Sequence, residues 1–373
     1  MRMRRGYLTF IAGFFVGLLA LSLLLRIYGG TSQVVAGEKP ESIDLVFLYT
    51  SEKEGWITAV KPLFEKWFYE RYGIKLNLVL YVTGSHETVD LMLQGSVKPD
   101  VWSPASSVWI PFFNKKWSET HGGEIIVSQW HPLVLSPVVL VGWEDIVRKY
   151  GVSSYRDLYR LDREGVDYKY GHPDPMLSNG GVIALLMEFA SAVNKTPEQL
   201  TVEDLKNPEA IEFVKAIESH AVYYGKSTGF FGSWAADNGP DAITFFTVYE
   251  NVVIENAPKA RGKWGQGLVA IYPNMGVVYS DHPLVILNAS WVDHWKRLAA
   301  LEFLSFLLRP EIQEMAEAHG FRPVNPLVPL DPEVFKAENG VVYKVPVPAL
   351  KPPKGEVLEA LFEVWILVRN PGV

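Results

Sequence analysis

Residues 99–109 have the sequence Pro-Asp-Val-Trp-Ser-Pro-Ala-Ser-Ser-Val-Trp, a short apolar run that ends in a hydroxyl-rich turn. Just upstream, the apolar and β-branched residues 76–82 predict a buried strand, and a helical pattern over residues 86–94 follows the turn at 83–85. We therefore expect two strand-to-helix turns at the C-terminal edge of one parallel sheet. Open α/β sheets bind ligands at that edge, where helix N-termini offer free N–H groups and partial positive charge.

These turns also have a simpler explanation. Serine is a common N-cap residue, because its hydroxyl accepts a hydrogen bond from a free N–H in the first helical turn. Ser85, Ser106 and Ser107 each fit that role, although several hydroxyl-bearing turns at one sheet edge also favour a binding site.

The segment 99–109 and the segments described below resemble extracellular solute-binding proteins of bacteria and archaea, in the type II class of periplasmic binding proteins. More narrowly, they are similar to the branch related to molybdate- and sulfate-binding proteins, over about residues 43–325. The resemblance implies a two-lobed α/β fold in which each lobe is an open sheet flanked by helices. It also implies that a small solute, such as an oxyanion, is captured between the lobes and delivered to the permease of an ABC-type importer.

Composition is consistent with an exported globular protein. The chain has 373 residues, enough for two lobes after a terminal segment, and its net charge of −7 argues against a nucleic-acid partner. It has no cysteine, which excludes disulfides, thiolate metal sites and a catalytic cysteine.

The N-terminus predicts export. Arg2, Arg4 and Arg5 precede an uncharged run from Gly6 to Leu25, which is long enough to span a bilayer and would leave the rest of the chain outside the cell. The competing interpretation is a signal peptide cleaved near residues 34–36, which would release a secreted protein. We expect a single-pass anchor in the cell membrane.

The domain division follows from these segments. We expect residues 1–28 to be the anchor or signal segment, 29–42 a linker, 43–135 the first part of lobe 1, 136–275 lobe 2, and 276–373 the return to lobe 1 with the C-terminal helices and tail.

A second loop, Ser178-Asn179-Gly180-Gly181, precedes a helical pattern over residues 182–194. It resembles the second-lobe helix that faces the ligand in this family, although capping and a glycine turn would also explain it. His172 and Asp174 lie just upstream. They are two residues apart with no further ligand nearby in sequence, so we expect no metal site there.

The strand predicted at residues 241–250 ends in Tyr249 and Glu250. The resemblance implies that Tyr249 reaches the solute. Glu250 departs from the pattern, because a carboxylate beside a bound oxyanion would repel it. Either Glu250 turns away into a salt bridge, or the solute carries a cationic or hydroxyl group.

The resemblance implies a ligand-binding set drawn from both lobes, with no catalytic residue, cofactor or metal, in a monomeric protein. That set is Thr50, Ser51, Gly84, Ser85, Ser106 and Ser107 from lobe 1, and Ser178, Asn179, Gly180 and Tyr249 from lobe 2.

Three alternatives remain open. The first is a membrane-anchored sensory or protein-binding receptor without transport. The second is a carbohydrate receptor of the same fold that uses Trp102, Trp109, Trp130 and Trp234. The third is an extracellular hydrolase that uses His172, Asp174 and Glu250.

Overall fold

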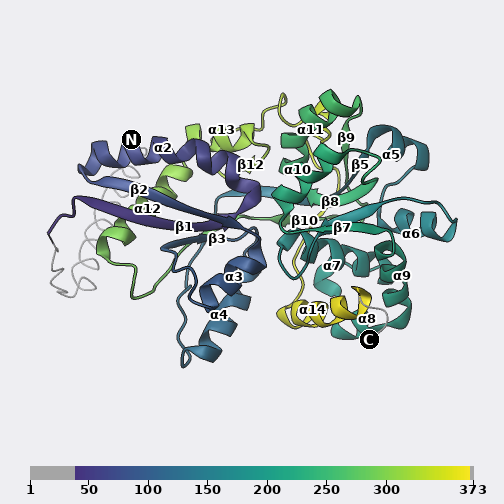
Figure 1. Ribbon diagram of the computed structural model, residues 1–373, viewed down its shortest axis with the longest axis horizontal. Coiled ribbons are helices and arrows are strands. Elements are labelled where there is room, and N and C mark those ends of the chain that lie inside the picture. Colours follow the sequence, from purple (N-terminus) through teal and green to yellow (C-terminus); the bar gives the residue numbers. More distant parts are fainter. Residues whose placement is uncertain (1–37, 370–373) are drawn as a thin grey trace, which may run out of the picture. The chain divides into compact units, whose positions relative to one another are not determined.

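The computed structural model describes residues 38–369, which form a mixed α/β structure with two main sheets (Figure 1). The predicted anchor or signal segment and most of the predicted linker lie outside these residues. Within 38–369, no helix has the length and apolar character needed to cross a membrane.

The first sheet has five strands in the order β2-β1-β3-β11-β4. These are β1 (Ser42–Thr50), β2 (Lys75–Thr83), β3 (Val101–Ser103), β4 (His131–Pro132) and β11 (Pro283–Ile286). Strand β1 pairs in parallel with β2 and β3, whereas β11 is antiparallel to both β3 and β4. The C-terminal ends of β1, β2 and β3 therefore share one edge, as the sequence predicts.

Helices α2 and α12 pack on one face of this sheet (Figure 1). Phe303 of α12 lies edge-on to Phe47 of β1, with ring centroids 5.3 Å apart, and 4.9 Å from Phe64 of α2. Burying such side chains contributes about 1.5–3 kcal/mol each. The helical elements of this half are η1 (Ser51–Lys53), α2 (Glu54–Tyr72), α3 (Ser85–Leu93), α4 (Trp109–Thr120), α12 (His294–Leu307) and α13 (Pro310–Ala318).

The second sheet is built around the ten-residue strand β5 (Val134–Trp143). Strands β8, β9, β10 and β12 all pair antiparallel to β5, and β13 pairs in parallel with β10. Their bounds are β8 (Phe245–Tyr249), β9 (Leu268–Ile271), β10 (Val277–Ser280), β12 (Arg322–Pro323) and β13 (Ala349–Leu350). A separate parallel pair joins β6 (Tyr170–Pro173) to β7 (Ala221–Gly225).

Helix α7 lies at the centre of this second half. It is buried from Asn179 to Ser191, and its only charged residue is Glu188. A helix that is apolar on all sides belongs in a protein interior. The helical elements of this half are α5 (Glu144–Tyr150), α6 (Tyr155–Arg163), α7 (Asn179–Val193), η2 (Pro197–Gln199), α8 (Val202–Lys206), α9 (Pro208–Glu218), α10 (Thr228–Asn238), α11 (Glu250–Trp264), η3 (Ala337–Asn339) and α14 (Gly355–Arg369).

The chain passes between the sheets at three short connections. Leu133 joins β4 to β5, residues 281–282 join β10 to β11, and residues 319–321 join α13 to β12. The lobe boundaries of the sequence-based division, at residues 135/136 and 275/276, lie near the first two of these connections, and the first boundary falls inside β5.

Helix α14 contacts both halves. It packs on α7, α8 and α9, and it lies beside α8 in Figure 1. On its other side, Phe362 lies 4.9 Å from the ring of His86, and Glu359 pairs with Lys115 of α4. The sequence-based division assigns residues 276–373 to the first lobe, whereas in the structure β10, β12 and β13 are strands of the second sheet and α14 packs on both halves.

Candidate functional site

Three turns of the first half carry predicted residues at the shared strand edge. Thr50 and Ser51 follow β1, Gly84 and Ser85 follow β2, and Ser106 and Ser107 follow β3. The hydroxyl of Ser85 accepts a hydrogen bond from the Ala105 N–H at 3.1 Å, which ties the second turn to the third. The Ser107 N–H donates to Asp281 Oδ1 at 2.7 Å, so this turn is also tied to the crossover between β10 and β11.

The second half contributes the starts of two helices. Ser178 precedes α7, and its hydroxyl lies 3.0 Å from that of Thr228 at the start of α10. A Cβ atom on Gly180 would stand 2.3 Å from the Thr228 hydroxyl, so only glycine permits this approach. The amide nitrogen of Asn179 donates to the Tyr249 hydroxyl and to the Ser280 hydroxyl, each at 3.0 Å.

These turns meet in one place, which we call the junction: the turns after β1, β2 and β3 together with the starts of α7 and α10. The hydroxyls of Ser51 and Ser227 lie 2.6 Å apart, and the Gly229 N–H donates to Ser51 at 3.2 Å. The Trp109 indole N–H donates to Asn179 Oδ1 at 3.0 Å. The structure therefore brings predicted residues of both halves together, in a closed arrangement in which their polar groups bond one another.

The main chain takes part in this closure. The N–H groups of His86 and Glu87, in the first turn of α3, both donate to the Leu177 carbonyl, at 3.0 and 3.4 Å. A protein carbonyl thus occupies the N-terminal donors of α3 that would otherwise be free for an acceptor.

A buried ion cluster at the junction was missed by the sequence interpretation. Lys53 Nζ lies 3.0 Å from Glu52 Oε1, and His282 Nδ1 lies 3.1 Å from the same oxygen, with all three side chains at most 2% exposed. The Thr50 hydroxyl bonds both Glu52 and Lys53. The one available indication was that Glu52 and Lys53 directly follow Thr50 and Ser51, since their partner His282 is remote in sequence.

The protonation of this cluster follows from burial and charge. Burial alone would raise the pKa of Glu52, but the charge of Lys53 and the hydrogen bond from His282 outweigh it, so the pKa lies well below its usual range. Burial lowers the pKa of Lys53, and burial together with the charge of Lys53 lowers that of His282. The lowered pKa favours the neutral imidazole of His282, whose Nδ1 lies 3.1 Å from Glu52 Oε1 and 3.4 Å from Lys53 Nζ, and its Nε2 has no partner among the described residues.

His282 also has an unusual backbone, with φ at +38°, a value that side chains other than glycine rarely adopt. Such conformations often occur at functional sites, where the surrounding structure imposes them. His282 lies in the connection between the two sheets, so a change in their relative position would act on it directly.

Glu250 turns away from the junction. Its carboxylate accepts two hydrogen bonds from Arg322, at 2.7 and 2.9 Å, and also bonds Tyr272. The first of the two alternatives for Glu250 is thus correct. Its neighbour Tyr249 stays at the junction, where burial raises the pKa of its hydroxyl well above the usual range.

The residues that suggested other functions are dispersed. Trp102 and Trp109 are fully buried, whereas Trp130 is 42% exposed and the ring of Trp234 lies tilted against that of Tyr223, with centroids 4.5 Å apart. Asp174 pairs with Arg369 rather than with His172, which contacts Glu218. No hydrolytic constellation of His172, Asp174 and Glu250 forms among the described residues.

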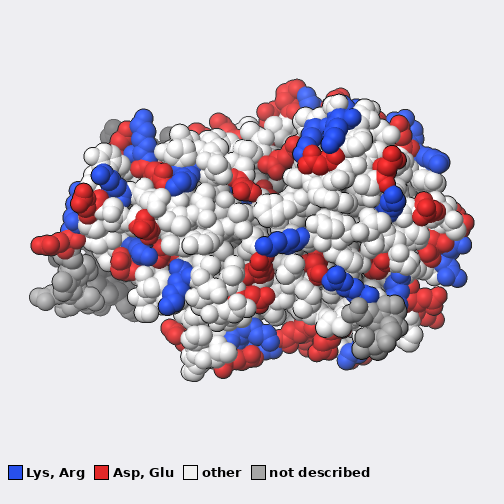
Figure 2. All heavy atoms as spheres, viewed as in Figure 1, with Lys and Arg blue, Asp and Glu red and all other residues white. Residues whose placement is uncertain are grey.

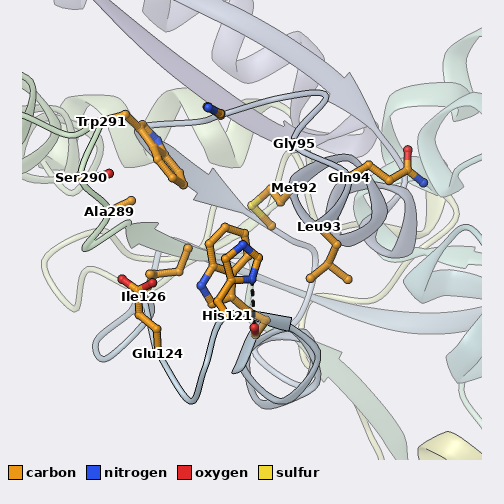
Figure 3. A pocket seen from close by; sticks show the side chains of 12 residues that line it. Met92, Leu93, Gln94, Gly95, His121, Glu124, Ile126, Ala289, Ser290 and Trp291 are labelled. Carbon is orange, nitrogen blue, oxygen red and sulfur yellow. Dashed lines mark hydrogen bonds between the residues drawn. The ribbon is translucent and has the colours of Figure 1, made fainter. Parts of the chain in front are cut away.

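A pocket lies at the C-terminal ends of α3 and α4, whereas the junction lies at their N-terminal ends (Figure 3). It has a volume of about 390 Å³ and lies where α3 and α4 end, with His121 stacked on Trp117 at 3.7 Å and Trp291 edge-on to Trp117 at 6.3 Å. None of the predicted binding residues lines it. On the face that Figure 2 shows, basic and acidic side chains are interspersed.

Comparisons with known proteins agree with this architecture. Residues 48–322 match the family described as "Bacterial extracellular solute-binding protein". A search of curated protein sequences finds no match. Among solved structures, an ABC transporter from Clostridium perfringens is 15% identical and covers 88% of this chain and 99% of its own, with a TM-score of 0.57.

Two other solved structures have similar folds. A periplasmic thiamin binding protein is 12% identical and covers 90% of this chain and 96% of its own, with a TM-score of 0.59. The ferric binding protein from Campylobacter jejuni is 14% identical and covers 88% of this chain and 99% of its own, with a TM-score of 0.57. At these identities, the comparison supports the fold alone.

Proposed function

Because the chain belongs to the bacterial extracellular solute-binding protein family, a non-enzymatic family, we propose that it captures a small solute at the junction and delivers it to an ABC-type permease. The single observation that carries this proposal is the meeting of helix starts from both halves, through Ser51 and Ser227 and through Trp109 and Asn179. The ligand-binding set is the one that the sequence predicts, extended by Ser227, Thr228 and His282.

In this proposal, the two sheets with their helices are lobes that separate to admit the solute. The second lobe also includes β10, β12 and β13, which the sequence-based division assigns to lobe 1, and α14 packs on both lobes. Each bond across the junction uses a group that a solute atom would engage on entry, such as the N–H groups of α3 that now donate to Leu177. Tighter binding to the closed state then shifts the population toward closure.

The chemistry of the junction favours a solute that accepts hydrogen bonds, and an oxyanion is the first choice. Hydroxyls, helix N-termini and Lys53 all offer donors, and Glu250 is held elsewhere by Arg322. The remaining carboxylate, Glu52, is already balanced by Lys53. A sugar is the second choice because its hydroxyls also bond such donors, although Trp102 is buried in the core and cannot stack on it.

A thermal unfolding screen of the full chain tests the proposal. The probes are molybdate, tungstate, sulfate, phosphate, thiamin, ferric citrate, amino acids and short sugars. A probe present at about 100 times its dissociation constant adds about 2.7 kcal/mol to the unfolding free energy, which raises the melting temperature by several degrees.

The matched variants are Ser178→Leu, at the junction, and Ser219→Leu, on the exposed end of α9. We expect the first to lose the probe-induced shift and the second to keep it. If both keep it, the solute binds elsewhere. If no probe raises the melting temperature of the parent chain, the small-solute proposal fails and a receptor for a protein partner is favoured.

The membrane anchor remains part of the proposal. Intact-mass analysis of the chain recovered from its native membrane distinguishes a retained segment 1–28 from cleavage near residues 34–36. A mature chain that begins after residue 36 and fractionates with soluble protein would contradict the anchor.

A further inference from the structure

We propose that His172, Glu188 and Glu218 form a binding site for one divalent transition-metal cation inside the second half, separate from the junction. One ligand atom from each side chain lies within 4.8 Å of the other two, and all three residues are buried. They come from β6, α7 and the end of α9, so the fold rather than local sequence assembles them. The inference does not depend on which solute the junction binds.

The unsatisfied atom in this cluster is Glu188 Oε2. It is buried, it belongs to the only charged residue of α7, and it has no hydrogen-bond donor among the described residues. An unpaired buried carboxylate oxygen is costly, whereas a cation bound in the cluster would satisfy it.

The surrounding groups orient the ligands as outer-shell partners do in metal sites. His172 Nδ1–H donates to the Pro173 carbonyl at 2.7 Å, and Nε2 faces Glu218 Oε1 at 2.9 Å, where it donates until a metal displaces its proton. Tyr224 donates to the other oxygen of Glu218 at 2.7 Å, and Tyr170 donates to Glu188 Oε1 at 2.8 Å. Each ligand is therefore held by a second hydrogen bond.

The charge of the cluster also favours a bound cation. Two carboxylates face one imidazole, and the nearby cation Arg369 is paired with Asp174 at 2.8 Å instead. One imidazole and two carboxylates, in a chain without cysteine, form a donor set that suits Zn²⁺, Co²⁺ or Mn²⁺.

Metal content of the full chain gives the first test. After chelation and reloading with Zn²⁺ or Co²⁺, the parent chain is expected to retain one equivalent, and the Co²⁺ form to show visible d–d absorption. Glu188→Gln keeps the shape of the side chain and the oxygen that Tyr170 bonds but removes the charge, and it is expected to weaken binding about tenfold or more. The matched control is Asp162→Asn, in the His220–Asp162 pair of the same half, whose atoms also lie 3.0 Å apart, and it is expected to bind as the parent does.

A second measurement needs no variant in the cluster. The Trp365 ring lies 5.6 Å from that of His172, so Co²⁺ should shift the ¹⁹F resonance of Trp365 in the chain labelled with 5-fluorotryptophan and leave that of the exposed Trp130 in place. Three results would overturn the site: a parent chain that retains neither metal, equal retention by E188Q, or an unchanged Trp365 resonance in the cobalt-loaded chain. A proton shared by Glu188 and Glu218 would then be the correct description.

Discussion

Arg322 donates two hydrogen bonds to Glu250, from Nε at 2.7 Å and from Nη2 at 2.9 Å, and so joins strand β12 to the first turn of α11. Glu250 is fully buried, and Arg322 also donates to the carbonyls of Val342 and Tyr343. The pair thereby fixes the chain that follows α13 to the second sheet.

Replacing Arg322 by methionine leaves the Glu250 carboxylate buried without a cation. We expect Arg322→Met to lower the unfolding free energy by about 3–5 kcal/mol, measured by urea denaturation. The control is Arg160→Met, because the Arg160–Glu164 pair is exposed and should contribute less than about 0.5 kcal/mol. In the double variant R322M/E250L, stability should partly recover, and equal losses in the single and double variants would contradict the argument.

Stability should depend on pH through His282. Burial and the charge of Lys53 lower the pKa of His282, so the folded chain favours its neutral form. Below about pH 6.5, the unfolded chain binds more protons, and this contribution to stability is lost as pH falls from there toward the lowered folded pKa.

The variant His282→Asn removes the titrating group and tolerates the positive φ. We expect its unfolding free energy to fall less steeply with decreasing pH than that of the parent between pH 6.5 and pH 5. The difference between the two slopes should correspond to the uptake of up to about one proton on unfolding. The control His294→Asn, at the exposed start of α12, should follow the parent curve. Parallel curves for the parent and H282N would show that His282 is not held neutral.

Gly84 permits the close approach of the halves. Its φ of −84° is open to any residue, but a Cβ atom would stand 2.3 Å from the Leu177 carbonyl oxygen. Gly84→Ala should therefore weaken closure without straining the first sheet. We expect the N–H groups of His86 and Glu87 to exchange with solvent about tenfold faster or more, in hydrogen-exchange experiments, while β1 exchanges as before.

The matched control for Gly84 is Gly262→Ala. Gly262 lies in α11, and a Cβ atom there would meet no other atom within 4 Å. Exchange at His86 should not change in G262A. If the His86 N–H exchanges as slowly in G84A as in the parent, the close approach of Gly84 to Leu177 does not hold the two halves together.

Helix α14 should favour the closed arrangement, because Phe362 packs against His86 while Trp365 packs against His172. We expect Phe362→Ala to increase the radius of gyration in small-angle X-ray scattering. Its stability loss should be smaller than the about 3–5 kcal/mol of a fully buried phenylalanine, because Phe362 is half-buried. Leu367→Ala, on the exposed side of the same helix, should leave the radius unchanged.

The local sequence pattern was sufficient to predict the strand and the helix on either side of the turn that follows β2. The expected strand at 76–82 is β2, and the expected helix at 86–94 is α3. Buried apolar runs and turn residues are local properties, so a single sequence reveals them.

Long-range packing explains what the sequence interpretation missed. Residues 223–238 are rich in glycine, serine and aromatic residues, a composition that indicates a loop, but they contain α10, whose Gly229 and Gly232 are poor helix formers. A Cβ on Gly229 would stand 2.9 Å from the Ser51 backbone, and one on Gly232 would stand 2.0 Å from Val252, so tertiary contact rather than propensity requires these glycines.

Contacts between residues far apart in the sequence also determine the candidate sites. Ser51 and Glu54 have the spacing of a capping box, but the Ser51 hydroxyl bonds Ser227, which lies in the other half. Likewise, His172 finds Glu188 and Glu218 on two separate helices, a grouping that no sequence spacing indicates.

The strand order of the first sheet has a consequence for the order in which the chain folds. Strand β11 lies between β3 and β4, and α12, which covers the face, follows it in sequence. A nascent chain therefore carries β1 to β4 for most of its synthesis without the segment that completes their sheet. The first sheet therefore waits for β11 until most of the second half has been made, and β4, whose partner is β11, stays unpaired throughout that interval.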